Sequence, residues 1–327
     1  MTNQTATTRL APSPTGGLHL GNARSFLLNW AIARRSGWRI LMRLDDLDAD
    51  RSSAEAERGL LESLDWLGID FDGPVLRQSE AGEQYHDALQ VLAEKGLVFR
   101  CARSRKELRE AADALGAPHE TGATIRTTAS MRPTDPEAWT LGGGDLNHRL
   151  ALEPGAEQVD DRLLGPLSID PSDAFGDPIL WTRRNVAAYH LASVVDDLAH
   201  GVTDVIRGED LLPSAGLHQR MASLLDGSPP RWWHLPLVLD ASGRRLAKRE
   251  GDRTLASFKA RGVPPERIIG LLARSSGLQP TLLPMTLSEL LDVLDVELLG
   301  ARAREESARG GHRITEEDIA WLEERTT

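Results

Sequence analysis

Three glycines and a histidine lie close together near the start of the chain, in the segment RLAPSPTGGLHLGN at positions 9–22. Glycines such as Gly17 and Gly21 beside a helix start let backbone N–H groups approach a phosphate, and the helix dipole favours the anion. His19 can donate a hydrogen bond to phosphate oxygens on which charge grows in a transition state. On its own, a histidine in a turn is more often a structural hydrogen-bonding residue than a catalyst.

A second segment with possible chemistry is strongly basic and reads RRLAKR at positions 244–249. A basic loop that closes over a triphosphate would neutralise the pyrophosphate that leaves when the α-phosphorus is attacked. Lys248 is the candidate for that role. Taken alone, the segment is better explained as a basic surface turn.

A third group could hold a small acid. Tyr189 offers a hydroxyl and Arg207 a guanidinium, and both lie on predicted elements that would converge with Arg9 at the crevice of a sheet. Arginine suits this purpose because its planar fork can grip a carboxylate at two points.

Helices and strands must position these residues, and the first part of the chain shows the patterns of such elements. We expect a strand at 7–10, a Pro/Gly loop at 12–17, a helix from about residue 22 to about 37, and a strand at 39–44. Asp45 follows this strand. Because the carboxyl ends of parallel strands face the ligand crevice of a doubly wound sheet, this acid should lie beside the loop.

Later elements repeat the pattern of helix and strand. Ser52 and Glu55 resemble a capping box, followed by leucines on one helical face. We expect a helix from Tyr189 through Leu198. The remaining predicted elements are a strand at 202–207, a helix at about 214–225, a strand at 233–239 and a helical tail with leucines at helical spacing between 287 and 294.

The predicted fold class is therefore α/β, with a doubly wound, Rossmann-like parallel sheet. We assign residues 1–99 and 185–240 to a split catalytic domain. Residues 100–184, where the periodicity weakens, are expected to be an inserted α+β module, and residues 241–327 a basic loop with a C-terminal helical domain.

Composition restricts the compartment and the partners. The formal net charge of −11 argues against a general affinity for nucleic acid. A local basic cluster remains at Arg103, Arg105, Lys106 and Arg109, and it is explained equally well as an RNA-binding face or as a solvated helix surface. The first residues lack the basic and apolar regions of a secretory signal, and no stretch is apolar enough to span a membrane. We expect a cytoplasmic monomer with no membrane association.

Taken together, the segments resemble a known family. Residues 9–22 resemble the HIGH signature of class I aminoacyl-tRNA synthetases in the form used by the glutamyl branch, and residues 245–249 resemble a variant of their KMSKS loop. The run from Tyr189 to Asp210 is similar to the stretch that joins these regions in glutamyl enzymes. The motifs occur in the family's order over about the first 255 residues.

The resemblance implies roles for individual residues. Arginine would hold the side-chain carboxylate of L-glutamate, Asp45 its amino group, and Lys248 the activation transition state. The positions that match the glutamate site are Arg9, Ser13, Asp45, Tyr189 and Arg207; those that match the ATP site are Gly17, His19, Gly21, Asp210, Val238 and Lys248. His19 and Lys248 would be catalytic, and Mg²⁺ would accompany the ATP.

Length separates members of this family. Full glutamyl-tRNA synthetases continue well past the KMSKS loop, whereas about 75 residues follow it here. This resembles the shortened enzymes that attach glutamate to the queuosine base at the wobble position of tRNA(Asp), which is the preferred interpretation. Two alternatives stay open: a truncated glutamyl-tRNA synthetase that charges tRNA(Glu), and a catalytically weakened paralogue that binds RNA or protein.

Several features depart from the family pattern, among them Ser193 in place of a larger polar residue seen in some members. Asp45 stands where glutamate is usual, which shortens the reach of the carboxylate, and Ala247 stands where serine is usual. Many members carry a zinc site in the insertion, but Cys101 is the only cysteine of this chain. One thiol cannot build a four-ligand structural site, so we expect no zinc and take His119 to be a loop histidine.

Overall fold

The computed structural model describes residues 5–103, 107, 127, 129–142, 145–244 and 253–324. Its centre is a parallel sheet in which β1 (Thr7–Leu10) pairs with β2 (Arg39–Leu44), and β2 pairs with β3 (Val75–Arg77). On the other side, β9 (Asp204–Gly208) pairs with β10 (Arg231–Leu235). A hydrogen bond of 2.9 Å from the Thr203 amide to the Thr7 carbonyl joins the two halves.

The strand order reverses at the junction of β1 and β9. From β1 the chain adds β2 and β3 in one direction, and from β9 it adds β10 in the other, followed by β6 (Glu157–Asp161) and the antiparallel β7 (Gly165–Ile169). Such a reversal leaves a crevice at the carboxyl ends of the strands. The α/β fold with a Rossmann-like parallel sheet is thereby confirmed.

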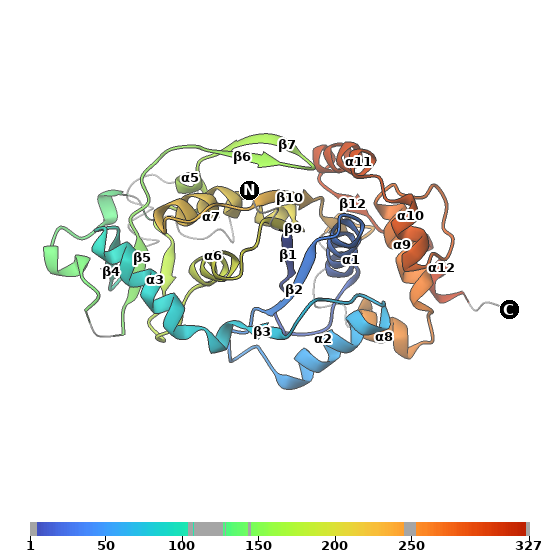
Figure 1. The fold of residues 1–327 in the computed structure, drawn as a ribbon, viewed down its shortest axis with the longest axis horizontal. Coiled ribbons are helices and arrows are strands. Elements are labelled where there is room, and N and C mark those ends of the chain that lie inside the picture. Colours follow the sequence, from blue (N-terminus) through green and yellow to red (C-terminus); the bar gives the residue numbers. More distant parts are fainter. Residues whose placement is uncertain are drawn as a thin grey trace.

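Helices cover both faces of this sheet, as Figure 1 shows. On one face lies α1 (Leu20–Arg35), with α2 (Ala54–Trp66) beside it in the same hydrophobic core. On the other face lie α6 (Tyr189–Ala199) and α7 (Leu212–Leu224), which share a second core with α3 (Gly82–Glu94). The sheet is therefore covered on both sides, which explains why almost every residue of β1, β2, β9 and β10 is buried.

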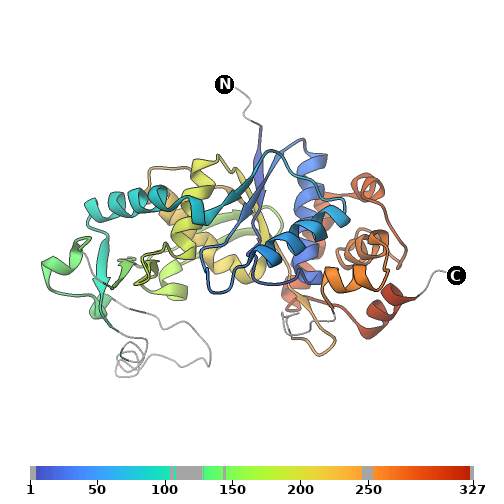
Figure 2. The same ribbon diagram turned by 90° about the horizontal axis from the view of Figure 1, so that it is seen from below.

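A smaller antiparallel sheet lies at one end of the molecule, in the segment that connects the two halves of the large sheet (Figure 2). It consists of β4 (Val98–Cys101), β5 (Asn147–Leu150) and β8 (Ile179–Trp181), with the short helix α5 (Pro171–Phe175) nearby in the chain. Short 3₁₀ helices occur at Gln78–Glu80, Ala129–Met131, Pro136–Trp139 and Glu209–Leu211. The predicted domain limits at residues 99, 184 and 240 stay predictions.

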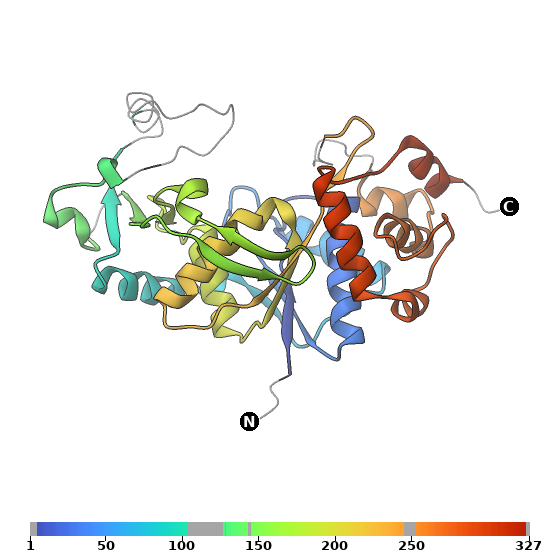
Figure 3. The ribbon, with the colours of Figure 1, turned by 90° about the horizontal axis from the view of Figure 1, so that it is seen from above.

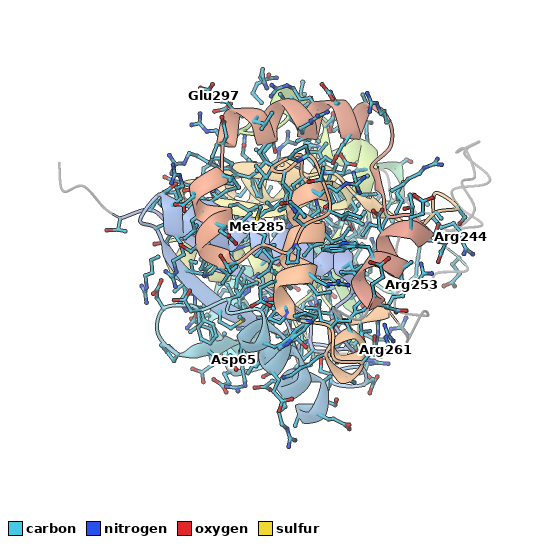
Figure 4. The ribbon with its side chains drawn as sticks, turned by 90° about the vertical axis from the view of Figure 1, so that its right-hand side faces the viewer. Asp65, Arg244, Arg253, Arg261, Met285 and Glu297 are labelled. Carbon is cyan, nitrogen blue, oxygen red and sulfur yellow. The ribbon has the colours of Figure 1, made fainter. Side chains whose placement is uncertain are left out.

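The C-terminal helices form the opposite end, seen face-on in Figure 4. They are α8 (Leu255–Ala260), α9 (Pro265–Ser275), α10 (Leu287–Val293), α11 (Val296–Ala308) and α12 (Glu316–Glu323), and they share the core of α1. Figure 3 shows α11 running alongside α1. Arg24 fixes this contact, since its buried guanidinium reaches Ser276 Oγ at 3.0 Å and Glu306 Oε2 at 2.8 Å.

Several predicted boundaries were wrong for identifiable reasons. The first helix begins at Leu20, two residues before the predicted start at about residue 22, because the side chain of His19 caps it. The cap of α2 is Ser53, whose hydroxyl accepts from the Ala56 amide at 3.1 Å, so the predicted capping box at Ser52 is wrong. The single strand predicted at 233–239 is two, β10 and β11 (Val238–Leu239), separated by Pro236 and Leu237.

The short strand β11, which follows β10 in the chain, pairs with β12 (His312–Arg313). This pairing brings the C-terminal region next to the end of β10. Within the described ranges, no helix combines the length and the apolar character needed to cross a bilayer.

Candidate active site

The crevice between β1 and β9 holds a pocket of about 380 Å³, a size typical of small-molecule sites. Most of the predicted site residues line it. They are Arg9, Ser13, His19, Gly21, Asp45, Tyr189, Arg207, Asp210 and Val238. Segments separated by more than two hundred residues, such as those of Arg9 and Val238, therefore meet at one place, as the doubly wound topology predicts.

Of the two remaining predicted residues, one lies away from the pocket lining and the other lies outside the described residues. Gly17 does not line the pocket; a Cβ there would lie 3.0 Å from the Thr254 side chain, so glycine permits the close approach of the segment that precedes α8. The Leu255 amide bonds to the Leu18 carbonyl at 2.8 Å in the same contact. Lys248 lies outside the described residues, as do Ala247, Arg105, Lys106, Arg109 and His119.

His19 closes the amino end of α1. Its Nδ1 accepts hydrogen bonds from the backbone amides of Gly21 at 3.1 Å and Asn22 at 3.4 Å. Since Nδ1 acts as an acceptor, the proton of the neutral ring is on Nε2, which makes that atom a donor. A Cβ at residue 21 would lie 3.1 Å from this ring, so glycine leaves the imidazole its room.

One side of the pocket, which we call the aspartate side, consists of Arg9 and Arg43 with Asp45, Asp196 and Asp197. Arg43 donates to Asp45 Oδ1 at 2.8 Å and to Asp197 Oδ1 at 2.7 Å, and Arg9 reaches the same Asp197 oxygen at 3.2 Å. Burial alone would lower the pKa of Arg43, but the surrounding carboxylates outweigh burial and raise it well above its ordinary value. Burial raises the pKa of Asp45. Here every cation has a carboxylate partner.

The opposite side, which we call the histidine side, consists of Arg207 with His190, His218, His234 and Trp232. The guanidinium of Arg207 lies 4.8 Å from the centre of the Trp232 ring and donates to His234 Nε2 at 3.1 Å and to the Leu211 carbonyl at 2.9 Å. Burial lowers the pKa of Arg207. Among the described residues its Nη1 has no hydrogen-bond partner.

The histidines of this side are neutral. Burial, with the nearby positive charge of Arg207, lowers the pKa of His190 to about 4 and that of His218 well below its ordinary value. Their rings bond to one another through His190 Nδ1 and His218 Nε2 at 3.0 Å. Tyr189 packs against both rings and is 38% exposed, so its hydroxyl-bearing ring is accessible at the mouth of the pocket.

The prediction missed Arg43, and it gave no role to Asp161, Asp196, Asp197 or His234. The signal for Arg43 was present, because it is a charged residue inside the otherwise apolar run ILMRL of β2. Such a residue requires partners when both faces of a sheet are covered. His234 carries no comparable signal, since a histidine next to two tryptophans on a strand fits an ordinary core position.

Cys101, at the end of β4, is a free thiol opposite Asn147. In the part of the chain that the structure describes, no three His, Cys, Asp or Glu side chains gather in a way that could hold a metal ion.

Comparison with known proteins identifies relatives across nearly the whole chain. Residues 5–290 match the family model of the class I tRNA synthetase (E and Q) catalytic domain. A glutamyl-Q tRNA(Asp) synthetase of Nitratidesulfovibrio vulgaris is 39% identical over 308 residues, covering 90% of this chain and 93% of the relative. Glutamate–tRNA ligase 2 of Cereibacter sphaeroides is 37% identical, covering 91% of this chain and 67% of the relative.

The fold has a similar solved counterpart. The crystal structure of a glutamate tRNA ligase from Elizabethkingia meningosepticum, in complex with its amino acid, superposes with a TM-score of 0.77 at 24% identity, over 98% of this chain and 69% of that structure.

Proposed function

The chain belongs to the class I tRNA synthetases (E and Q), and from this premise we propose that it activates L-glutamate with ATP and transfers it to the queuosine base at the wobble position of tRNA(Asp). Relatives named glutamyl-Q tRNA(Asp) synthetase, at 38–41% identity, support this choice of acceptor. The proposed enzyme is therefore a ligase that acts on glutamate, ATP and tRNA.

The observation that carries the proposal is the state of Arg207. Its guanidinium is buried, its Nη1 has no partner among the described residues, and it lines the same pocket as Arg9 and Tyr189. A buried donor on a cation is costly to leave unpaired. A ligand carboxylate would supply the missing acceptor, which makes the side-chain carboxylate of glutamate the natural occupant.

The rest of the substrate would lie toward the aspartate side. We assign the ammonium group of glutamate to Asp45, whose oxygens accept from Arg43 but retain further lone pairs. Ser13 and Tyr189 would donate hydroxyl hydrogen bonds, and Arg9 would attract the α-carboxylate. The α-carboxylate oxygen must stay free to react, so no residue is assigned to neutralise it fully.

ATP would occupy the end of the pocket formed by the start of α1 and by Val238. His19 offers Nε2–H to the phosphates, and it lies at the amino end of α1, where the helix dipole favours an anion. Gly21 leaves space for the nucleotide, and Asp210 is assigned to the ribose or base. Lys248 would stabilise the charge on the leaving pyrophosphate, and Mg²⁺ would arrive with the ATP, held mainly by phosphate oxygens.

The reaction has two steps. A glutamate α-carboxylate oxygen forms a bond to the α-phosphorus of ATP, and the bond from that phosphorus to the pyrophosphate oxygen breaks, giving glutamyl-adenylate. A hydroxyl of the queuosine then attacks the adenylate carbonyl, loses its proton, and AMP leaves. The pocket contributes by aligning the two substrates and by placing donors where negative charge grows.

Charging of tRNA(Glu) is the second candidate, because glutamate–tRNA ligases are also among the relatives at 37% identity. The two candidates share the adenylate and differ only in the acceptor. A paralogue that merely binds RNA or protein would form no adenylate.

The deciding experiment incubates the purified protein with ATP and labelled glutamate, in parallel with tRNA(Asp) that contains queuosine, tRNA(Asp) that lacks it, and tRNA(Glu). We expect label only on the first. Label on tRNA(Glu) would replace the proposal with the synthetase alternative. Absence of glutamate-dependent pyrophosphate exchange would show that the chain is not an activating enzyme.

A further inference from the structure

Behind Arg207 lies a line of buried hydrogen bonds that the reaction as described does not use. Arg207 Nε donates to His234 Nε2 at 3.1 Å, and His234 Nδ1 lies 2.6 Å from Asp161 Oδ2. The three side chains come from neighbouring strands, β9, β10 and β6, and none is more than 7% exposed. The line therefore runs through the sheet from the pocket into the core.

The chemistry of this line fixes the protonation of the imidazole. An arginine Nε can only donate, so His234 Nε2 must be the acceptor and carry no proton. The ring is then neutral, with its proton on Nδ1, where it donates to the Asp161 carboxylate. Burial, the largest influence, also lowers the pKa of His234, which agrees with a neutral ring.

Asp161 is satisfied without contacting Arg207. Its carboxylate accepts from the backbone amides of Leu163 at 3.0 Å, Leu164 at 2.8 Å and His234 at 3.1 Å, in addition to the imidazole. Amides and a neutral ring can stabilise a buried carboxylate. The negative charge is thus held away from the guanidinium by the width of a ring.

The consequence is seen by comparing Arg207 with Arg43. Arg43 donates directly to two aspartates, so its charge is compensated before any ligand arrives. Arg207 donates instead to a neutral imidazole and to a backbone carbonyl, it packs over Trp232, and its Nη1 has no partner among the described residues. These three contacts fix the orientation of Arg207, and none of them is with a carboxylate.

We propose that His234, oriented by Asp161, is a positioning residue that determines specificity: it fixes Arg207 through a neutral acceptor and so makes the pocket select a carboxylate over an amide. This inference rests on the proposed function, because it assumes that glutamate is the amino acid. A buried cation whose direct hydrogen-bond partners are neutral favours glutamate over glutamine, since a carboxylate completes the ion pair and an amide does not. An anionic partner in place of His234 would remove that preference.

Two substitutions of equal length separate charge from hydrogen bonding. His234→Gln keeps a neutral acceptor for Arg207, whereas His234→Glu replaces it with a carboxylate. In glutamate-dependent pyrophosphate exchange, we expect His234→Glu to raise KM for glutamate by roughly 10-fold to 100-fold, the range for losing a charge-assisted bond, and to shrink the preference for glutamate over glutamine. His234→Gln should stay within a few fold of wild type in both quantities.

Asp161→Asn and Asp204→Asn provide a second pair in case the charged variant does not fold. Both are buried aspartates of the same sheet, but Asp204 bonds to Trp233 Nε1 at 2.9 Å and to Arg231, away from the pocket. Thermal unfolding checks that each variant is folded. Asp161→Asn should lower the preference for glutamate over glutamine while KM for ATP stays constant, and Asp204→Asn should leave that preference unchanged.

The outcomes distinguish the two proposals. If wild type activates glutamate but His234→Glu and Asp161→Asn keep its KM and its preference over glutamine, the inference about His234 is overturned and the function stands. If wild type itself activates no glutamate, the function and the inference fall together.

Discussion

The aspartate side and the histidine side of the pocket hold their arginines in opposite ways. On the aspartate side, Arg43 and Arg9 share the carboxylate of Asp197 at 2.7 Å and 3.2 Å, and all three side chains are buried. On the histidine side, Arg207 is equally buried but donates to neutral groups. Breaking a buried ion pair destabilises a fold, whereas an uncompensated buried cation costs stability until a ligand arrives.

This difference indicates a division of labour. The aspartate side stabilises the junction of β1, β2 and α6, and the histidine side keeps a charge ready for the substrate. Sites that bind well are often locally destabilising, because groups arranged for a ligand are imperfectly satisfied without it. Substitutions on the two sides should therefore change different measured quantities.

The largest effect is expected for Arg207→Ala. It removes the proposed partner of a desolvated carboxylate, which should weaken glutamate binding by about 2–5 kcal/mol, or roughly 30-fold to several-thousand-fold. The free energy of unfolding should fall less than in a variant that leaves a buried charge unpaired, since the groups that lose a partner, His234 Nε2 and the Leu211 carbonyl, are neutral. Calorimetric titration with glutamate and urea denaturation measure the two quantities. Unchanged glutamate affinity would refute the assignment of Arg207 to the substrate carboxylate.

Asp197→Asn should show the opposite pattern. It leaves Arg9 and Arg43 with one carboxylate fewer in a buried site, so we expect the free energy of unfolding to fall by about 3 kcal/mol. Asp50→Asn is the control, because its ion pair with Arg184 has both side chains at least 70% exposed and should contribute little. Equal urea midpoints for the two variants would contradict the stabilising role of the aspartate side.

The histidine side should make stability depend on pH. The pKa of His190 is about 4 in the folded protein and about 6.5 when unfolded, so between these values the unfolded state binds the extra proton. Stability is then complete above pH 6.5 and declines as the pH falls toward 4. His190→Asn should reduce this slope by about 1.4 kcal/mol per pH unit, measured by denaturation at several pH values. The slope above pH 7 should not change.

The sequence predicted the histidine side less well than the aspartate side, for a physical reason. Asp45 and Arg207 follow or end predicted strands, so topology alone brings them to one crevice, as observed. The partners of Arg207 depend on β6 pairing with β10, a contact between strands about seventy residues apart. Nothing local in the chain near Asp161 specifies that pairing.

The predicted boundaries of helices and strands were wrong where a single side chain, and not the pattern of apolar residues, sets the end of an element. His19 extends α1 by capping it, and Pro236 divides the strand predicted at 233–239, since proline cannot donate a ladder hydrogen bond. The α/β class, the switch point and most pocket residues followed from apolar runs and from the family motifs. The orientation of each guanidinium did not, because it is set by partners distant in the sequence.

The smallest effect on glutamate binding is expected for a substitution of Asp45, which could serve both the fold and the substrate. Its carboxylate accepts from Arg43 at 2.8 Å and 3.4 Å, so it could act for the fold, for the substrate ammonium group, or for both. If Asp45 binds the substrate ammonium group, Asp45→Asn should raise KM for glutamate roughly 5-fold to 30-fold, which corresponds to about 1–2 kcal/mol of binding free energy. Stability should fall by a similar amount or less, because Asp197 still pairs with Arg43. A loss of stability with an unchanged KM would make Asp45 a partner of Arg43 alone, and the ammonium group would need another acceptor.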